Sequence, residues 1–197
     1  PLNGKSVFFF PDSQLEPLDT QHPIWTAQHP IYPDADRPLL GLQACCRTSV
    51  VYCPTNLSCY WNLRRPVVMK YLAERANDRR YATIKERVDY CSKIGVNVVT
   101  YATGRELRDK GDTPTLEQDA QSVLANRSIQ IPKLAHGGGQ NEAPNAWRNV
   151  LKELRKTGLS VDLGEQFVAP DLSALSDYPF VFMHGRSRFA FTPEQRA

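Results

Sequence analysis

The sequence predicts an α/β fold with a mainly parallel sheet, and two strand ends carry most of that prediction. An apolar run over 129–135 stops at His136, and a second run over 179–183 stops at His184. Glycine follows each histidine, and a helix-like segment over 144–157 lies between the two runs. Strand, helix and strand in this order are typical of a βαβ unit, which builds parallel sheets.

Residues 1–66 are expected to be rich in β structure and irregular. β-Branched and aromatic residues predict strands over 6–10 and 48–53. Closely spaced prolines exclude a long helix here, because proline has no N–H to donate. A short pattern recurs at His22-Pro23 and His29-Pro30, and we interpret both copies as loop-packing motifs in extended segments.

Residues 70–109 have the three-four spacing of one helix face. The apolar or small positions are Tyr81, Ile84, Val88, Cys91, Gly95, Val98 and Ala102. A long helix is therefore the first interpretation. The alternative is that Gly95 ends the helix and the β-branched run after it starts a buried strand.

Residues 110–128 contain Gly111 and Pro114 and are predicted to be a linker. The segments after it are a strand, a glycine loop, a helix, a strand, a short helix and a strand, over 129–135, 137–143, 144–157, 160–163, 171–176 and 179–183. The first helix is well signalled, because Pro144 stands in its first turn and Gly158 follows its last.

Composition limits the classes of partner. The chain has 197 residues, of which 41% are hydrophobic, enough for a packed core. Basic and acidic residues number 24 and 21 and are spread along the chain, so we expect no nucleic-acid partner. No apolar run is long enough to span a bilayer and no signal peptide is visible at the first residues.

The five cysteines show no spacing typical of a zinc site. They are Cys45, Cys46, Cys53, Cys59 and Cys91. The adjacent pair Cys45-Cys46 could form a redox element, but small buried residues near a strand are the preferred interpretation.

A possible ligand site lies where the first predicted strand gives way to the helix. Gly137, Gly138, Gly139 and Asn141 would let backbone N–H groups face an anion or phosphate near the helix start. The loop lacks the residues of a P-loop and the spacing of a dinucleotide-binding loop, so a plain tight turn is an equal alternative.

His136 and His184 end strands that should be neighbours, so their rings could lie close together. Such a pair could bind a metal or act as a base, or both rings could be structural and hydrogen-bonded. No Asp or Glu stands at the predicted strand ends, and a metal normally takes three or four protein ligands. We therefore expect neither a metal nor a cofactor.

Further polar residues are candidates by position. Arg186 and Arg188 follow His184 and could bind a carboxylate or phosphate. Asn97, Tyr101 and Arg105 are four apart and share a helix face. No nucleophile elbow of the Gly-x-Ser-x-Gly kind exists, so acyl chemistry has no candidate nucleophile.

Two sets of longer strings carry a resemblance to a known family. The first set lies at 131–138, 143–147, 177–186 and 189–192, and the second at 22–24, 48–52, 57–61 and 95–105. These strings resemble an uncharacterised bacterial family, domain-of-unknown-function family 4159. The first set is similar to the amino-terminal half of that domain and the second to its carboxyl-terminal half.

The resemblance implies a flavodoxin-like, class I glutamine amidotransferase-like three-layer fold, with a sheet that is incomplete or composite. The halves stand in reversed order, with the C-terminal half of one domain in 1–109 and the N-terminal half of a second in 129–197. A tandem repeat cut within each copy, or a circular permutation, would produce this order. A capping box begun at Thr192 favours a tandem fragment. The resemblance also implies an exported or membrane-associated parent protein.

The expected function is a non-catalytic ligand-binding or protein-interaction domain, whose partner is a small anionic ligand or a protein. The alternative is a hydrolase-type enzyme that uses His136 and His184. The candidate ligand-binding residues are His136, Gly137, Gly138, Gly139, Asn141, His184 and Arg186.

Overall fold

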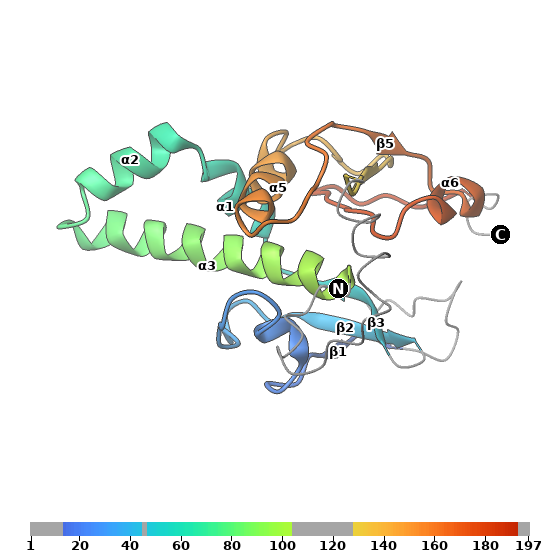
Figure 1. Cartoon of the computed structure of the whole chain (residues 1–197), viewed down its shortest axis with the longest axis horizontal. Coiled ribbons are helices and arrows are strands. Elements are labelled where there is room, and N and C mark those ends of the chain that lie inside the picture. The colour runs from blue at the N-terminus through green and yellow to red at the C-terminus, as the bar shows by residue number, and fades with distance from the viewer. Residues whose placement is uncertain (1–13, 45–46, 104–127, 193–197) are drawn as a thin grey trace, which may run out of the picture.

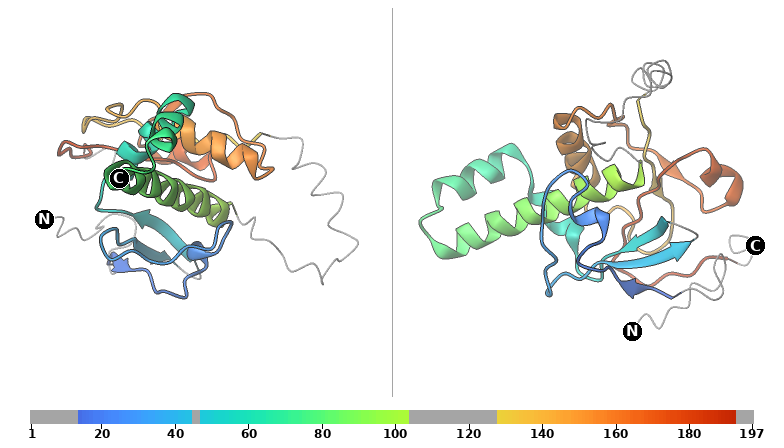
Figure 2. Two further views of the ribbon diagram at one scale, coloured as in Figure 1. Left: turned by 90° about the vertical axis from the view of Figure 1, so that its left-hand side faces the viewer. Right: turned by 60° about the horizontal axis from the view of Figure 1, so that its bottom comes forward.

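The computed structural model describes residues 14–44, 47–103 and 128–192, which form a mixed fold of helices and two small sheets (Figure 1). The α/β character predicted from the sequence is confirmed. A long helix, α3 (Arg79–Ala102), crosses the middle of the molecule. An antiparallel sheet lies on one side of α3, and the parallel strands with the helices next to them lie on the other (Figures 1 and 2).

The antiparallel sheet is formed by β1 (Glu16–Pro17), β2 (Leu40–Ala44) and β3 (Arg47–Tyr52), in that order. The predicted strand at 48–53 is therefore confirmed as β3, whereas the one at 6–10 lies outside the described residues. Residue 41, in the middle strand β2, is a glycine because a Cβ at this position would be 2.3 Å from Leu18 Cδ2.

Three α-helices follow the sheet, namely α1 (Leu57–Leu63), α2 (Pro66–Glu74) and α3. The helix expected over 70–109 is thus divided between α2 and α3. The division falls at Asp78, whose side chain accepts a hydrogen bond of 2.9 Å from Arg80 N and caps the new helix.

The helical interpretation of the segment around Gly95 is confirmed, and the buried-strand alternative is wrong, because α3 runs through it without a break. Gly95 lies where α3 meets α1 and α5 (Ala146–Lys156), the helix predicted at 144–157. A Cβ at Gly95 would be 3.0 Å from both Trp61 Cζ2 and Val150 Cγ1. The glycine therefore allows close helix packing and does not end the helix.

The C-terminal segment forms a parallel arrangement of three strand segments. β4 (Lys133–Leu134) pairs with β5 (Phe167–Val168), and a parallel bridge joins Lys133 to Phe182 on the other side of β4. β4 is thus the middle segment, and α5 connects it to its first partner. α6 (Leu172–Ser176) confirms the short helix predicted at 171–176.

The sheet is not mainly parallel over the described residues, because the larger of the two sheets is antiparallel. The predicted strands at 129–135 and 160–163 pair at the Ile129–Val161 bridge and then separate before β4 meets β5. Pro132 has no N–H to continue the pairing. Only three residues separate Ile129 from Lys133, whereas five separate Val161 from Phe167, so a continuous register is impossible.

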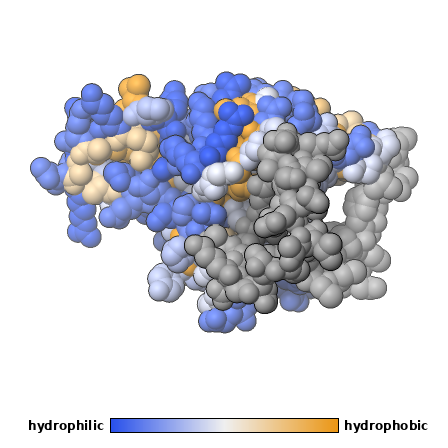
Figure 3. All heavy atoms as spheres, in the orientation of Figure 1, coloured by the Kyte–Doolittle hydropathy of each residue, from blue (hydrophilic) through white to orange (hydrophobic). Residues whose placement is uncertain are grey.

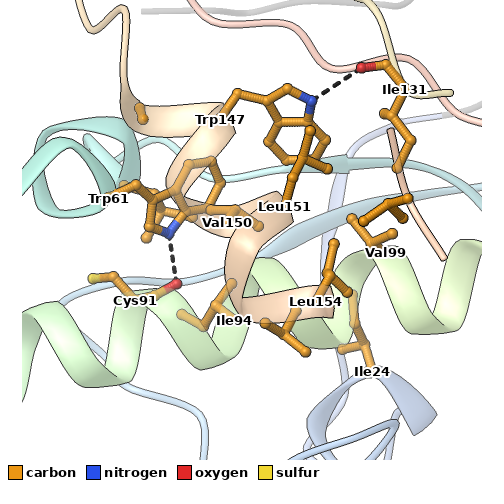
Figure 4. Packing of buried hydrophobic residues seen from close by; sticks show 14 of the residues in the cluster. Ile24, Trp61, Cys91, Ile94, Val99, Ile131, Trp147, Val150, Leu151 and Leu154 are labelled. Carbon is orange, nitrogen blue, oxygen red and sulfur yellow. Dashed lines mark hydrogen bonds between the residues drawn. The ribbon is translucent and has the colours of Figure 1, made fainter. Parts of the chain in front are cut away.

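One hydrophobic core joins the segments on either side of the predicted linker (Figure 4). The Trp61 and Trp147 rings pack with their centroids 6.2 Å apart, and Asn149 Nδ2 donates to Trp61 O at 2.8 Å. Residues 47–103 and 128–192 therefore pack as one body. The assignment of 1–109 and 129–197 to halves of two domains stays a prediction.

We predict that Leu154→Ala lowers the free energy of unfolding by about 2–5 kcal/mol, because the side chain is 0% exposed and its removal leaves a cavity. Val67→Ala, at a position 80% exposed, should change the free energy by less than about 0.5 kcal/mol. Urea unfolding followed by tryptophan fluorescence measures both. Two separate transitions would contradict the single shared core.

Candidate functional site

The structure brings His136 and His184 together at the same edge of the parallel strands. His136 follows β4, and His184 follows the segment that bridges to it at Phe182. The His136 ring contacts the backbone of the second histidine, with 2.8 Å between Nε2 and His184 O. The two strand ends therefore meet, as their place in a parallel arrangement predicted.

Both ring nitrogens of His136 are used in hydrogen bonds to the backbone. Gly138 N–H donates to Nδ1 at 2.9 Å, so Nδ1 accepts, while Nε2 must donate to the His184 carbonyl. The ring is thus held as the neutral Nε2–H tautomer. Phe189 stacks on it with ring centroids 4.1 Å apart. His136 has no nitrogen left for a metal or a substrate.

The glycines around His136 allow close approach of chain segments. A Cβ at Gly138 would be 2.4 Å from Phe189 Cδ1, and one at Gly185 would be 2.7 Å from His136 Cε1. Gly139 has a φ of +78°, which favours glycine. At Gly137, by contrast, a Cβ would meet nothing within 4 Å.

The Gly138 peptide links the glycine loop to the second strand end. Its carbonyl accepts from Arg186 N at 2.9 Å and from Ser187 N at 3.1 Å, while its N–H is taken by His136. This amide is therefore not available to an anion. The tight-turn interpretation of the loop describes Gly138 better than the phosphate-loop interpretation does.

His184 has a different environment from His136. Its ring is partly buried, and Nε2 has no hydrogen-bond partner among the described residues. Burial, and next the positive charge of Arg186, lower the pKa of His184 below its ordinary value of 6.5. The imidazole is neutral at pH 7.

Arg186 connects the two halves of the chain. Its Nε lies 3.3 Å from Glu142 Oε2, and its Nη2 contacts the Cys59 thiol at the start of α1. Asn141 and Arg188 are exposed near this loop. Sequence reasoning did not place Cys59 at the site, because no local signal links it to a residue 127 positions away.

The other histidine and cysteine predictions have mixed outcomes. His22 Nε2 lies 2.8 Å from Thr48 Oγ1, and the amide of Asn97 bonds the backbone of His29, so both His-Pro motifs pack loops. The paired cysteines and Arg105 lie outside the described residues. Cys91 is fully buried, and burial raises the pKa of its thiol to about 12.

Lys133 is a buried cation that sequence reasoning missed. The residue is only 4% exposed, and its Nζ lies 3.4 Å from Pro144 O and 5.6 Å from the centre of the Phe167 ring. Burial lowers the pKa of its ammonium group. The available signal was a lysine inside an apolar strand-like run.

The part of the chain that the structure describes holds no cluster of three or more His, Cys, Asp or Glu side chains able to bind a metal ion. Within the same ranges, no helix has the length and apolar character needed to cross a membrane. Comparison with protein-family models, curated proteins and solved structures finds no match for this chain.

Gly138→Ala should lower the free energy of unfolding by about 1–3 kcal/mol, because the added methyl group would overlap Phe189 and the Ser187 carbonyl. Gly137→Ala is the matched control and should change it by less than about 0.5 kcal/mol, since open space surrounds that position. Thermal and urea unfolding measure both. Equal effects would show that the loop does not pack as described.

The free energy of unfolding should fall as the pH drops from 7 through 6.5 and below, because the unfolded ring of His184 takes up a proton that the folded ring resists. Arg186, Glu142, Lys133 and His136 are the charged or titratable groups around it.

His184→Gln should reduce this pH dependence in urea titrations at several pH values. The dependence should not vanish, because burial also lowers the pKa of His29. An unchanged slope in His184→Gln would contradict the assignment.

Proposed function

We propose that this chain is a non-catalytic ligand-binding or protein-interaction domain on a flavodoxin-like, class I glutamine amidotransferase-like scaffold. The observation that carries the proposal is the state of His136. Since its two nitrogens bond Gly138 N–H and His184 O, the most prominent candidate side chain serves the structure. Catalysis by the pair would require those bonds to break.

The order of the parallel segments supports the scaffold. Along the chain, β4 is the first parallel segment, β5 the second and the segment at Phe182 the third. In space β4 lies between the other two, so the order across the sheet is second, first, third. Flavodoxin-like sheets begin in this way, with the order 2-1-3-4-5. The single core supports a composite unit made from both halves of the chain.

A small anionic ligand is the proposed partner at the strand ends. Ligands of such sheets bind outside the carboxyl ends of the strands, where the strand order reverses, and here that place is the outer side of the strand ends that carry His136 and His184. Gly137, Asn141 and Arg186 are exposed there. Arg186 would exchange its ion pair with Glu142 for the ligand. Export or membrane association of the parent protein stays a prediction.

One observation favours the alternative, a hydrolase. His184 Nε2 has no hydrogen-bond partner among the described residues, and the lowered pKa of this ring leaves it neutral at pH 7. A neutral imidazole can act as a general base. In this mechanism His184 would act alone, because His136 has no free nitrogen.

A hydrolysis assay distinguishes these functions. We expect wild-type protein and His184→Ala to hydrolyse p-nitrophenyl acetate and p-nitrophenyl phosphate at the same background rate, with or without added Zn²⁺. Circular dichroism controls for folding of the variant. A wild-type rate at least 10-fold above that of His184→Ala would contradict the proposal and favour the hydrolase.

A further inference from the structure

Two helices form an arm that projects from the body of the molecule. We define the arm as residues 66–90, which comprise α2, the turn after it and the first half of α3; the two helical parts lie side by side away from the sheets (Figures 1 and 2). Leu72 and Val88 are its buried apolar side chains among the described residues. The arm therefore has little core of its own.

One face of the arm collects a distinct set of side chains. Tyr71 stands one position before the buried Leu72 in α2, and Arg87 stands one position before the buried Val88 in α3. Because the two helices are antiparallel, the same step back along each helix turns the side chain towards the same side of the pair. Tyr71 and Arg87 therefore lie on one side of the arm. Residues at steps of three or four positions from Tyr71 in α2, and from Arg87 in α3, lie on the same helix face as these two. The arm face consists of Val67, Tyr71, Arg75, Arg80, Ile84 and Arg87.

The apolar members of the arm face are open to solvent. Val67 is 80% exposed, Tyr71 43% and Ile84 37%. The guanidinium of Arg75 lies 3.8 Å from the centre of the Tyr71 ring, and Tyr81 meets that ring edge-on at 5.8 Å. These contacts order the aromatic part of the face, and tyrosine and arginine are the types that dominate binding at protein interfaces.

The arm also concentrates positive charge. The 25 residues 66–90 contain six basic and four acidic residues, a net charge of +2, whereas the whole chain of 197 residues carries +3. The arm face has three arginines and no acid. Among the described residues, Arg80 pairs with its own helix cap, Asp78, at 3.3 Å, and its side chain is 86% exposed.

We infer that the arm face docks an acidic amphipathic helix of a partner protein, which would complete a three-helix bundle. This inference deepens the proposed function and rests on it, since it names the partner of a protein-interaction domain. Glutamates on the partner helix would pair with the arginines, and its apolar stripe would cover Val67 and Ile84.

The mixed character of the arm favours protein over the other anionic partners. On the face of the arm seen in Figure 3, a few hydrophobic side chains lie among hydrophilic ones. A phosphate backbone offers nothing to the exposed Val67 and Ile84 and would meet the acids Glu74, Asp78 and Glu86. A membrane surface would favour a larger apolar stripe with bulky side chains.

Fluorescence anisotropy tests the inference with a defined probe. The probe is a labelled amphipathic peptide of about 20 residues, with leucine at heptad positions a and d and glutamate beside them. We expect it to bind at least 10-fold more tightly than the same peptide with lysine in place of glutamate. No preference between them would overturn the inference.

Matched variants assign the binding to the arm face. Arg87→Glu and Ile84→Glu should each weaken binding at least 10-fold. Lys93→Glu changes the charge as much as Arg87→Glu does, but lies on another side of α3, and should change binding less than 3-fold. Urea unfolding checks that the variants fold. Equal losses in Arg87→Glu and Lys93→Glu would overturn the inference.

Tighter binding to a 20-nucleotide single strand of DNA, or to vesicles containing phosphatidylserine, would also overturn it if Arg87→Glu abolished that binding. The proposed function has its own, separate failure. A hydrolysis rate that depends on His184 contradicts the non-catalytic assignment and leaves the peptide result unchanged.

Discussion

The packing of α1 and α5 against one face of α3 is the contact on which the rest of the structure depends. Trp61 and Trp147 form its centre, with ring centroids 6.2 Å apart, and each indole N–H bonds a backbone carbonyl of the neighbouring segment. Gly95 makes this approach possible. Because the same contact joins residues on either side of the predicted linker, it also sets where the parallel strands lie relative to the antiparallel sheet.

Close packing also holds the two strand ends in place. Phe182 stacks on Trp147 at 4.3 Å, so the core continues directly into the segment that carries His184. Beyond Phe182, the His136 ring lies between the loops that contain Gly138 and Gly185. It hydrogen-bonds Gly138 N–H in the first loop and the His184 carbonyl beside the second. His136 is therefore packed and hydrogen-bonded at the edge of the parallel strands, whereas Nε2 of His184 is buried there without a hydrogen-bond partner among the described residues.

Much of the local structure could be predicted from the sequence. α5 lies within the predicted 144–157 because its apolar stripe and its stop glycine are local signals. The extent of the parallel strands could not be predicted, since Pro132 and a register mismatch shorten them. The contact of Arg186 with Cys59 was equally hidden, because it spans 127 positions.

The sequence by itself determined the type of most helices and strands and the position of both histidines at strand ends. Those features depend on spacing, glycine and proline, which act on neighbouring residues. Only the tertiary structure decided that His136 is a structural ring, that α3 continues through Gly95 and that none of the described segments covers one side of the arm. Each of these outcomes depends on which distant backbone or side chain fills the adjacent space, and the linear pattern does not encode it.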